Sequence, residues 1–317
     1  MEKPKVRISV RNLVEFILRS GDLDNSRGSS GDKEAMLKGG RLHRKIQRSM
    51  KGNYQAEVSL KRESEYEDVI IQVEGRADGI FTEDGEFWID EIKGTYGNLQ
   101  AMEVPVPVHR AQAMCYGWIY GEKEGLSQIG IQMTYSHLDT EDTRRFREIF
   151  SMEELKNWYQ KLLDDYHKWI SCSLSWKKER NASMKDLQFP FPYREGQREI
   201  VSGVYHTVSS KKTLFVQAPT GVGKTMSAIF PSVRAIGEGK GETLFYLTAK
   251  TITGTVAWEA FHTLRENGLK FKVTAITAKE KLCFLDSPEC TPEKCPYAKG
   301  HFDRVNDAVY ELWTTEE

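Results

Sequence analysis

A glycine-containing loop lies in the second half of the chain, between a short apolar segment and an expected helix. Residues 217–225 read Gln-Ala-Pro-Thr-Gly-Val-Gly-Lys-Thr. The two glycines let backbone N–H groups turn toward phosphate oxygens, and the helix N-terminus adds partial positive charge. The lysine is expected to reach the β- and γ-phosphates, and the last threonine to ligate Mg²⁺. The residues predicted to bind a nucleoside triphosphate are Thr220, Gly221, Val222, Gly223, Lys224 and Thr225.

Two acidic residues and a lysine lie on neighbouring strands of an expected hairpin. Asp78 ends one strand, and Glu91 and Lys93 lie on the next, after a turn at 83–86. Because side chains alternate along a strand, Glu91 and Lys93 share one face, and pairing can bring Asp78 beside Glu91. Two carboxylates can hold Mg²⁺ or Mn²⁺, and the lysine can orient the attacking water. The pattern indicates metal-assisted phosphodiester hydrolysis, although a Glu-x-Lys pair alone is commonly a solvated ion pair.

Further polar side chains flank the hairpin. His43 lies upstream on a basic helix and could supply another metal contact, or could be a plain surface residue of that helix. Gln112 and Tyr116 lie one turn apart on a downstream helix, with His109 on the same face, and could support the site. The basic helix could bind phosphates or present a solvated face; its cations are Arg41, Arg44, Lys45, Arg48 and Lys51.

The cysteines indicate a metal site near the end of the chain. Three of the five cluster, at Cys283, Cys290 and Cys295. An odd count without an export signal favours an intracellular protein and metal binding over disulfides. Thiolates are natural ligands of iron–sulfur clusters. A zinc site completed by His301 and free thiols in a loop are the alternatives.

The elements that position these residues follow from periodicity and capping signals. Ser9 can cap the first helix, and the Ser-Met-Glu-Glu run from Ser151 is a capping box that opens a long one. After residue 189 the pattern becomes strand–helix–strand, which predicts a parallel sheet with helical crossovers. The expected helices are 9–19, 33–51, one that Pro105 and Pro107 precede and that runs to about 120, a long one after 151, 224–236 and 252–265. The expected strands are 55–61, 67–81, 87–93, 128–136, 213–218, 243–248 and 271–277.

The composition is that of a globular protein. Hydrophobic residues make up 39% and charged residues 29% of 317, which fits two domains. The formal net charge of −1 means that any nucleic-acid binding must come from local patches. No apolar run approaches the ~18–20 residues of a membrane span, and no signal peptide is recognisable. We expect a cytoplasmic protein with no membrane partner.

The phosphate loop and its surroundings resemble XPD/DinG-type superfamily 2 iron–sulfur helicases. The loop has Ala218 in place of the usual first glycine, as in Ala-x-Thr-Gly-x-Gly-Lys-Thr of that superfamily. The segment 191–197 looks like the family's adenine-recognition segment, which implies that Tyr193 and Gln197 contact the base. The cysteines lie where the family inserts a [4Fe–4S] domain. The resemblance implies ATP as the nucleotide, 5′–3′ movement on single-stranded DNA, and a role in DNA repair or recombination. The expected partner is single-stranded or junction DNA.

The N-terminal half resembles RecB-like PD-(D/E)XK nucleases. The elements that carry the resemblance occur in the family's order: His43, Asp78, Glu91-x-Lys93 and Gln112-x3-Tyr116. In that family the histidine adds a metal contact and the Gln–Tyr helix supports the site and DNA. A degenerate nuclease fold that only anchors a helicase to DNA is one alternative. A P-loop remodelling ATPase with a zinc knuckle is another.

Together these resemblances predict an α/β chain with two domains. A PD-(D/E)XK nuclease-like domain is expected over 1–175 and a linker over 176–188. An incomplete RecA-like lobe is expected over 189–317, with the cysteine insert from about 279. No acidic Walker B-like strand or second motor lobe follows, so we expect an N-terminal piece of a longer, bacterial, nucleoid-associated protein. The fourth cluster ligand is then expected beyond residue 317, and this chain alone should neither hydrolyse ATP nor unwind DNA.

Overall fold

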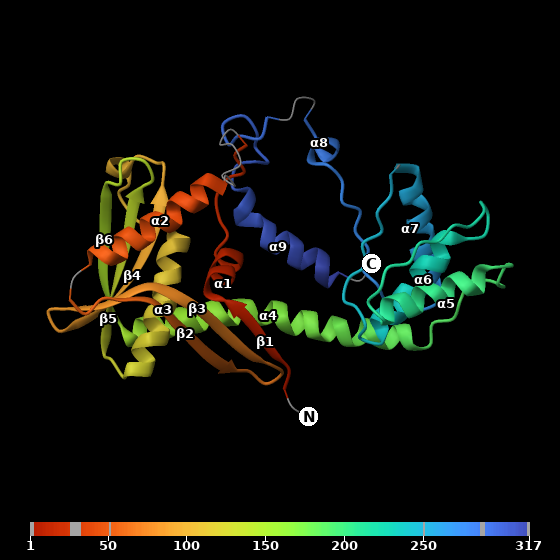
Figure 1. Cartoon of the computed structure of the whole chain (residues 1–317), viewed down its shortest axis with the longest axis horizontal. Coiled ribbons are helices and arrows are strands. Elements are labelled where there is room, and N and C mark those ends of the chain that lie inside the picture. Colours follow the sequence, from red (N-terminus) through yellow and green to blue (C-terminus); the bar gives the residue numbers. More distant parts are fainter. Residues whose placement is uncertain (1–2, 26–32, 51, 250, 286–288, 316–317) are drawn as a thin grey trace. The chain divides into compact units, whose positions relative to one another are not determined.

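The computed structural model describes residues 3–25, 33–50, 52–249, 251–285 and 289–315. It shows a mixed α/β protein (Figure 1). The chain divides into two compact units. The first combines Met1–Ser171 with Cys283–Glu317, and the second is Cys172–Leu282. The predicted domain boundaries stay predictions, and Lys51 of the predicted basic helix lies outside the described residues.

The first unit is built on a mixed six-stranded sheet with the order β1-β3-β4-β5-β6, while β2 pairs with β3. Its strands are β1 (Lys5–Ser9), β2 (Gln55–Glu65), β3 (Ile70–Glu83), β4 (Glu86–Thr95), β5 (Gln128–His137) and β6 (Thr143–Ser151). The β1–β3 and β4–β5 pairs are parallel, and the others are antiparallel. Strand β5, which lies between β4 and the edge strand β6, is buried along nearly its whole length, as expected for a strand covered on both faces.

The hairpin that carries the acidic residues forms as predicted. Asp84 and Gly85 connect β3 to β4 with φ angles of 52° and 84°. Two successive residues in the left-handed region make the turn that fits the natural twist of a hairpin, and Asp-Gly is a favoured pair for it. The register places Gly79 opposite Asp90, which sets the faces of the site strands.

Helices pack around the sheet of the first unit. They are α1 (Val10–Ile17), α2 (Lys33–Ser49), η1 (Leu99–Ala101), α3 (Pro107–Glu124), α4 (Met152–Lys185) and α9 (His301–Thr314). The Ser9 hydroxyl accepts from the Asn12 N–H, which confirms the first cap. Ser151 and Glu154 exchange hydrogen bonds of 2.9 and 3.2 Å as a capping box. Most of the linker predicted over 176–188 is helical, because α4 continues to Lys185.

The C-terminal segment of the first unit packs on the chain that follows α1. The Leu23 N–H donates to the Ala298 carbonyl, and the Phe302 N–H donates to the Gly21 carbonyl, both at 2.9 Å. The Asp303 carboxylate accepts from the Gly21 N–H at 2.8 Å. We call this set of contacts the clasp.

Aromatic packing extends the clasp. Trp169 lies edge-on to Phe16 and to Tyr310, with ring centroids 5.0 Å apart in both pairs. The Asn306 side chain donates to the Phe16 carbonyl at 2.6 Å. The segment after residue 289 is thus bonded to elements near the N-terminus.

The second unit is helical in its described part. It contains α5 (Gln197–Ser209), α6 (Lys224–Gly237), α7 (Thr251–Glu266) and the short α8 (Lys279–Leu282), besides the end of α4. Its core joins α6 and α7 through buried residues such as Ile229, Val233 and Leu264. No helix among the described residues of either unit is long and apolar enough to span a membrane.

The expectation of three strands in the second unit is wrong for the described residues. Segments 213–218, 243–248 and 271–277 are not strands, and no ladder joins them. Phe215 and Leu247 are 92% and 88% exposed. A strand needs a hydrogen-bonded neighbouring strand, and these segments have none in the described part of the chain, although Leu244, Phe271 and Val273 pack against the core of the second unit.

Candidate functional site

Lys93 is the central contact of the predicted hydrolytic site. Its Nζ lies 2.8 Å from Glu91 Oε1 and donates to Gln112 Oε1, also at 2.8 Å. Strand alternation puts Glu91 and Lys93 on the face that α3 covers, and Gln112 projects from α3 toward them. The structure thus brings together Glu91, Lys93 and Gln112.

Asp78 belongs to the same group. Its Oδ2 accepts from the Ile92 N–H at 2.7 Å, which fixes the carboxylate beside the Glu91–Lys93 stretch of β4. His43 Nδ1 lies 3.6 Å from Asp78 Oδ1. Five predicted residues from α2, β3, β4 and α3 therefore meet at one end of the β3–β4 pairing.

Gln47 is a member of this site that the sequence did not reveal. Its Nε2 donates to the Asp78 carbonyl and to Glu57 Oε1, both at 2.9 Å. The β2–β3 ladder runs on both sides of this point, but no ladder pair joins Glu57 to Asp78. Glu57 has a φ of 59°, a left-handed conformation that costs energy in a residue other than glycine. Because this one pair is missing from the β2–β3 ladder, the Asp78 carbonyl accepts a hydrogen bond from the Gln47 side chain instead of from β2.

The electrostatics of Glu91 distinguish it from an exposed carboxylate. It is 5% exposed, and its Oε2 atom is buried without a hydrogen-bond partner. Burial, followed by the neighbouring Asp78 charge, raises the pKa of the Glu91 carboxyl to about 7, while Lys93 opposes the shift. Asp78 and Glu91 therefore lie near each other, and one buried oxygen of Glu91 has no hydrogen-bond partner.

A divalent cation between Asp78 and Glu91 would give the unpartnered oxygen of Glu91 a ligand contact. Mg²⁺ is commonly held by one or two carboxylates and keeps several waters. Asp78 and the orphaned oxygen of Glu91 provide this donor set. Across the described ranges, no three His, Cys, Asp or Glu side chains form a ready-made metal cage. The residues therefore fit a largely hydrated Mg²⁺ or Mn²⁺ held by two carboxylates.

Tyr116, one turn beyond Gln112, packs closely against β3. A side chain at Gly75 would put its Cβ 2.6 Å from the Tyr116 hydroxyl, so only glycine fits there. Burial and the Glu91 charge raise the pKa of the tyrosine well above its ordinary value, so it stays a neutral phenol.

His109 Nδ1 lies 3.2 Å from the Tyr135 hydroxyl. Burial and the nearby Lys93 charge lower the pKa of His109 to about 4, so its ring is neutral.

Asp90 forms a separate buried network. It is fully buried and accepts hydrogen bonds from Tyr54, Gln132 and Thr134 at 3.1, 3.0 and 2.6 Å. Burial raises its pKa, and these donors oppose the shift. Both oxygens of the Asp90 carboxyl accept hydrogen bonds from protein side chains and need no ligand. The network therefore anchors β4 rather than adding to the hydrolytic group.

The phosphate loop of the second unit has the predicted backbone. Gly221 and Gly223 have φ angles of 89° and 84°, which side chains rarely adopt, and α6 starts at Lys224. Lys224 Nζ donates to the carbonyls of Ala218 and Pro219 at 2.8 and 3.0 Å. The amine thus bridges the loop at the position where phosphate oxygens are expected.

The segment predicted to recognise adenine lies against this loop. Gln197 is buried and approaches Gly223, and its Oε1 accepts from the Arg194 N–H at 3.0 Å. Arg194 also donates to the Gly221 carbonyl. Tyr193 is 39% exposed and stacks on Phe189 at 4.4 Å, which leaves part of its ring accessible. The Thr225 hydroxyl accepts from Tyr246 at 3.3 Å.

The three clustered cysteines belong to the first unit. Cys295 is buried, while Cys283 and Cys290 are half-buried, and all are free thiols. Cys290 takes part in the clasp through its carbonyl, which accepts from the Asn25 N–H at 2.9 Å. In the part of the chain that is described they do not gather in a metal-binding arrangement. As placed, they do not fit a cluster, so [4Fe–4S] binding stays a prediction.

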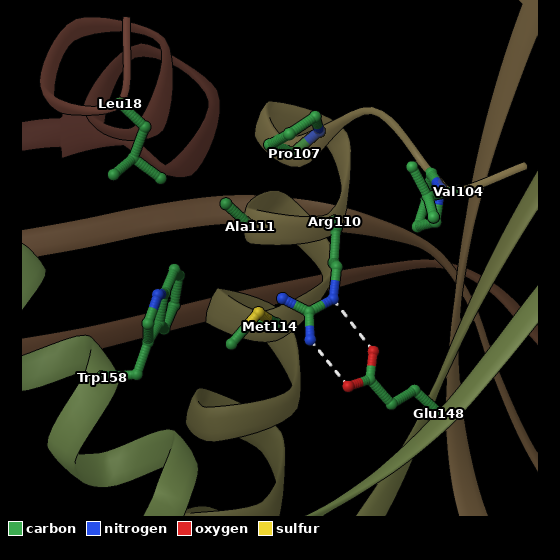
Figure 2. A pocket seen from close by; sticks show the side chains of 9 residues that line it. Leu18, Val104, Pro107, Arg110, Ala111, Met114, Glu148 and Trp158 are labelled. Carbon is green, nitrogen blue, oxygen red and sulfur yellow. Dashed lines mark hydrogen bonds and ion pairs between the residues drawn. The ribbon is translucent and has the colours of Figure 1, made fainter. Parts of the chain in front are cut away.

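A separate cavity of about 420 Å³ opens beside α3 (Figure 2). Arg110 forms one polar wall with a two-point ion pair to Glu148, at 2.9 and 2.7 Å. The other walls are largely apolar and include Leu18, Val104, Pro107, Ala111, Met114 and Trp158. No residue of the hydrolytic group lines this cavity.

Comparisons with known proteins support one coarse relationship. No family model matches the chain. A probable ATP-dependent helicase of Methanocaldococcus jannaschii is 40% identical over 47 residues, which make up 14% of this chain and 7% of that protein. The crystal structure of SSO0001 aligns over 51% of this chain and 78% of that chain, with 20% identity and a TM-score of 0.34, which carries no inference. The chain thus has a helicase-like relationship over a short stretch and spans a small part of that relative.

Proposed function

We propose that the first unit is a divalent-metal-dependent DNA nuclease of the RecB-like PD-(D/E)XK type. The observation that carries the proposal is the shared contact of Lys93 with Glu91 and Gln112 beside Asp78. Asp78 and Glu91 would hold the cation, His43 lies 3.6 Å from Asp78, and Lys93 would orient the attacking water. Gln112 fixes Lys93, and Tyr116 packs behind them. A bound Mg²⁺ or Mn²⁺ acidifies water and stabilises developing phosphate charge.

We further propose that the second unit binds ATP as part of an XPD/DinG-type helicase that acts in DNA repair or recombination. Support comes from the two left-handed glycines, the start of α6 at Lys224, and the contact of Gln197 with the loop. Lys224 would exchange its loop carbonyls for phosphate oxygens, and Thr225 would ligate Mg²⁺. Single-stranded DNA is the proposed partner of both units.

The decisive experiment is cleavage of a labelled single-stranded oligonucleotide with Mg²⁺ or Mn²⁺. We expect cleavage by the wild type and its loss in Asp78→Ala and Lys93→Ala. Retained circular dichroism and metal-free melting show that the variants fold. DNA binding without cleavage by the wild type would instead support a nuclease fold that only anchors DNA.

A further inference from the structure

Helix α2 presents three chemically different sides. Leu42 and Ile46 are buried against Ile92 of β4. His43 and Gln47, one turn apart, both contact Asp78. The remaining side is exposed and basic. At 3.6 residues per turn, Arg44 and Arg48 lie directly beside the side that carries His43 and Gln47.

The cations of this helix differ in their pairing. Lys38 lies 3.1 Å from Asp139, and Lys45 pairs with Glu141, so both are neutralised by the β5–β6 loop. The arginine stripe, which consists of Arg41, Arg44 and Arg48, has no ion pair or hydrogen bond of its side chains within the described residues. Of these three arginines, Arg44 and Arg48 lie nearest the side that carries His43 and Gln47, and Arg41 lies farther round the helix.

We propose that the arginine stripe binds the phosphate backbone of a DNA strand and directs it toward Asp78 and Glu91. The proposal rests on the proposed nuclease function. Guanidinium groups bind phosphate by two parallel hydrogen bonds, and unpaired ones need not break an existing ion pair first. Asp78 and Glu91 would repel the DNA phosphates on their own. The positive charge of the neighbouring arginine stripe would offset that repulsion. Binding through phosphates carries no base preference.

The test uses the whole chain and fluorescence anisotropy of a labelled single-stranded oligonucleotide in EDTA, where no cleavage occurs. The variant is Arg44→Gln with Arg48→Gln. The matched control is Lys38→Gln with Lys45→Gln, which removes equal charge from the opposite edge of the same helix. Each variant is titrated at several salt concentrations, and a duplex of the same sequence is titrated in parallel.

We expect the arginine variant to bind single strands about tenfold more weakly at low salt, with a log–log salt slope smaller by about 1.4 for two lost contacts. The control should keep the wild-type affinity and slope. Equal weakening in both variants, or an unchanged arginine variant, would overturn the proposal. Preferential loss of duplex binding would show that the stripe binds duplex rather than single-stranded DNA and would also overturn it.

The two proposals fail separately. The Asp78→Ala variant should bind DNA at least as tightly as the wild type, because it removes a negative charge near the arginine stripe. If the wild type binds in this pattern but never cleaves with Mg²⁺ or Mn²⁺, the nuclease function fails and the stripe stands. If the wild type cleaves while the arginine variant binds normally, only the stripe fails.

Discussion

The Gln47 side chain donates to the Asp78 backbone carbonyl at 2.9 Å, where the β2–β3 ladder omits one pair. It also donates to Glu57, the residue whose left-handed backbone accompanies that omission. The position of a proposed metal ligand therefore depends on a helix side chain as well as on strand pairing.

Replacing Gln47 with alanine should shift Asp78 and lower cleavage by about tenfold. A lost hydrogen bond to a partly buried carbonyl should also lower the free energy of unfolding by about 1 kcal/mol. Metal titration of cleavage rates tests the first effect, and urea melting the second. Gln128→Ala is the control, because Gln128 makes a similar bond to Glu86 elsewhere in the sheet. Unchanged metal dependence in Gln47→Ala would contradict a positioning role.

The raised pKa of Glu91 predicts a pH-dependent stability of the metal-free protein. The folded-state pKa is about 7 and the ordinary value is 4.5, so the folded state binds the proton more tightly. This stabilisation is complete below about pH 4.5 and is lost as the pH rises through 7, by roughly 3 kcal/mol in total. Melting in EDTA between pH 5 and 8 should show the decline in the wild type and lose that component in Glu91→Gln. Replacement of the exposed Glu103 by glutamine should leave it unchanged.

Lys224→Ala should abolish binding of a fluorescent ATP analogue with little effect on folding. Lys224 is exposed and bonds only to loop carbonyls that water can also satisfy. Stability should therefore change by less than about 0.5 kcal/mol, as for most surface substitutions. Lys212→Ala removes an exposed lysine outside the loop and should bind the analogue normally. Equal analogue binding by both variants would contradict a phosphate-binding role.

Anaerobic reconstitution with iron and sulfide tests the [4Fe–4S] cluster that the sequence resemblance predicts. Visible absorption and iron and sulfide content should fall sharply in Cys283→Ser, Cys290→Ser and Cys295→Ser. Cys172→Ser should keep them, because Cys172 lies apart on α4. A colourless protein that carries zinc would favour a zinc site instead.

Trp169→Ala should loosen the clasp. Its side chain is 7% exposed and contacts Phe16, Tyr310 and Trp313, and loss of such a side chain costs about 3 kcal/mol. Hydrogen exchange of the amides of Gly21 and Leu23 should then accelerate, because their bonds to the C-terminal segment define the clasp. Unchanged protection of both amides would contradict that account.

Local signals predicted much of the first unit. Ser9, the Asp84-Gly85 turn, Pro107 and the Ser151 capping box each act within a few residues and each mark the expected element. The strand β6 was missed because its Arg- and Glu-rich sequence reads as polar, and its arginines lie along an exposed edge. Such charged residues commonly protect sheet edges.

Longer-range features could not be read in the same way. Gln47 is an ordinary helix residue until the break at Glu57 exposes a carbonyl to it. The segment at Phe215 has the apolar composition of a buried strand, but strand formation depends on a neighbour that composition does not specify. The order of the motif residues in the family resemblance pointed to His43, and the structure places its ring 3.6 Å from Asp78.

The clasp has a topological consequence. Because the first unit takes in both Met1–Ser171 and Cys283–Glu317, the second unit is an insertion with both ends tied to its host. A protease nick within 240–249 would cut the polypeptide there without releasing the distal piece, since non-covalent bonds still hold it. The two fragments should elute together in native size exclusion and separate only in denaturant.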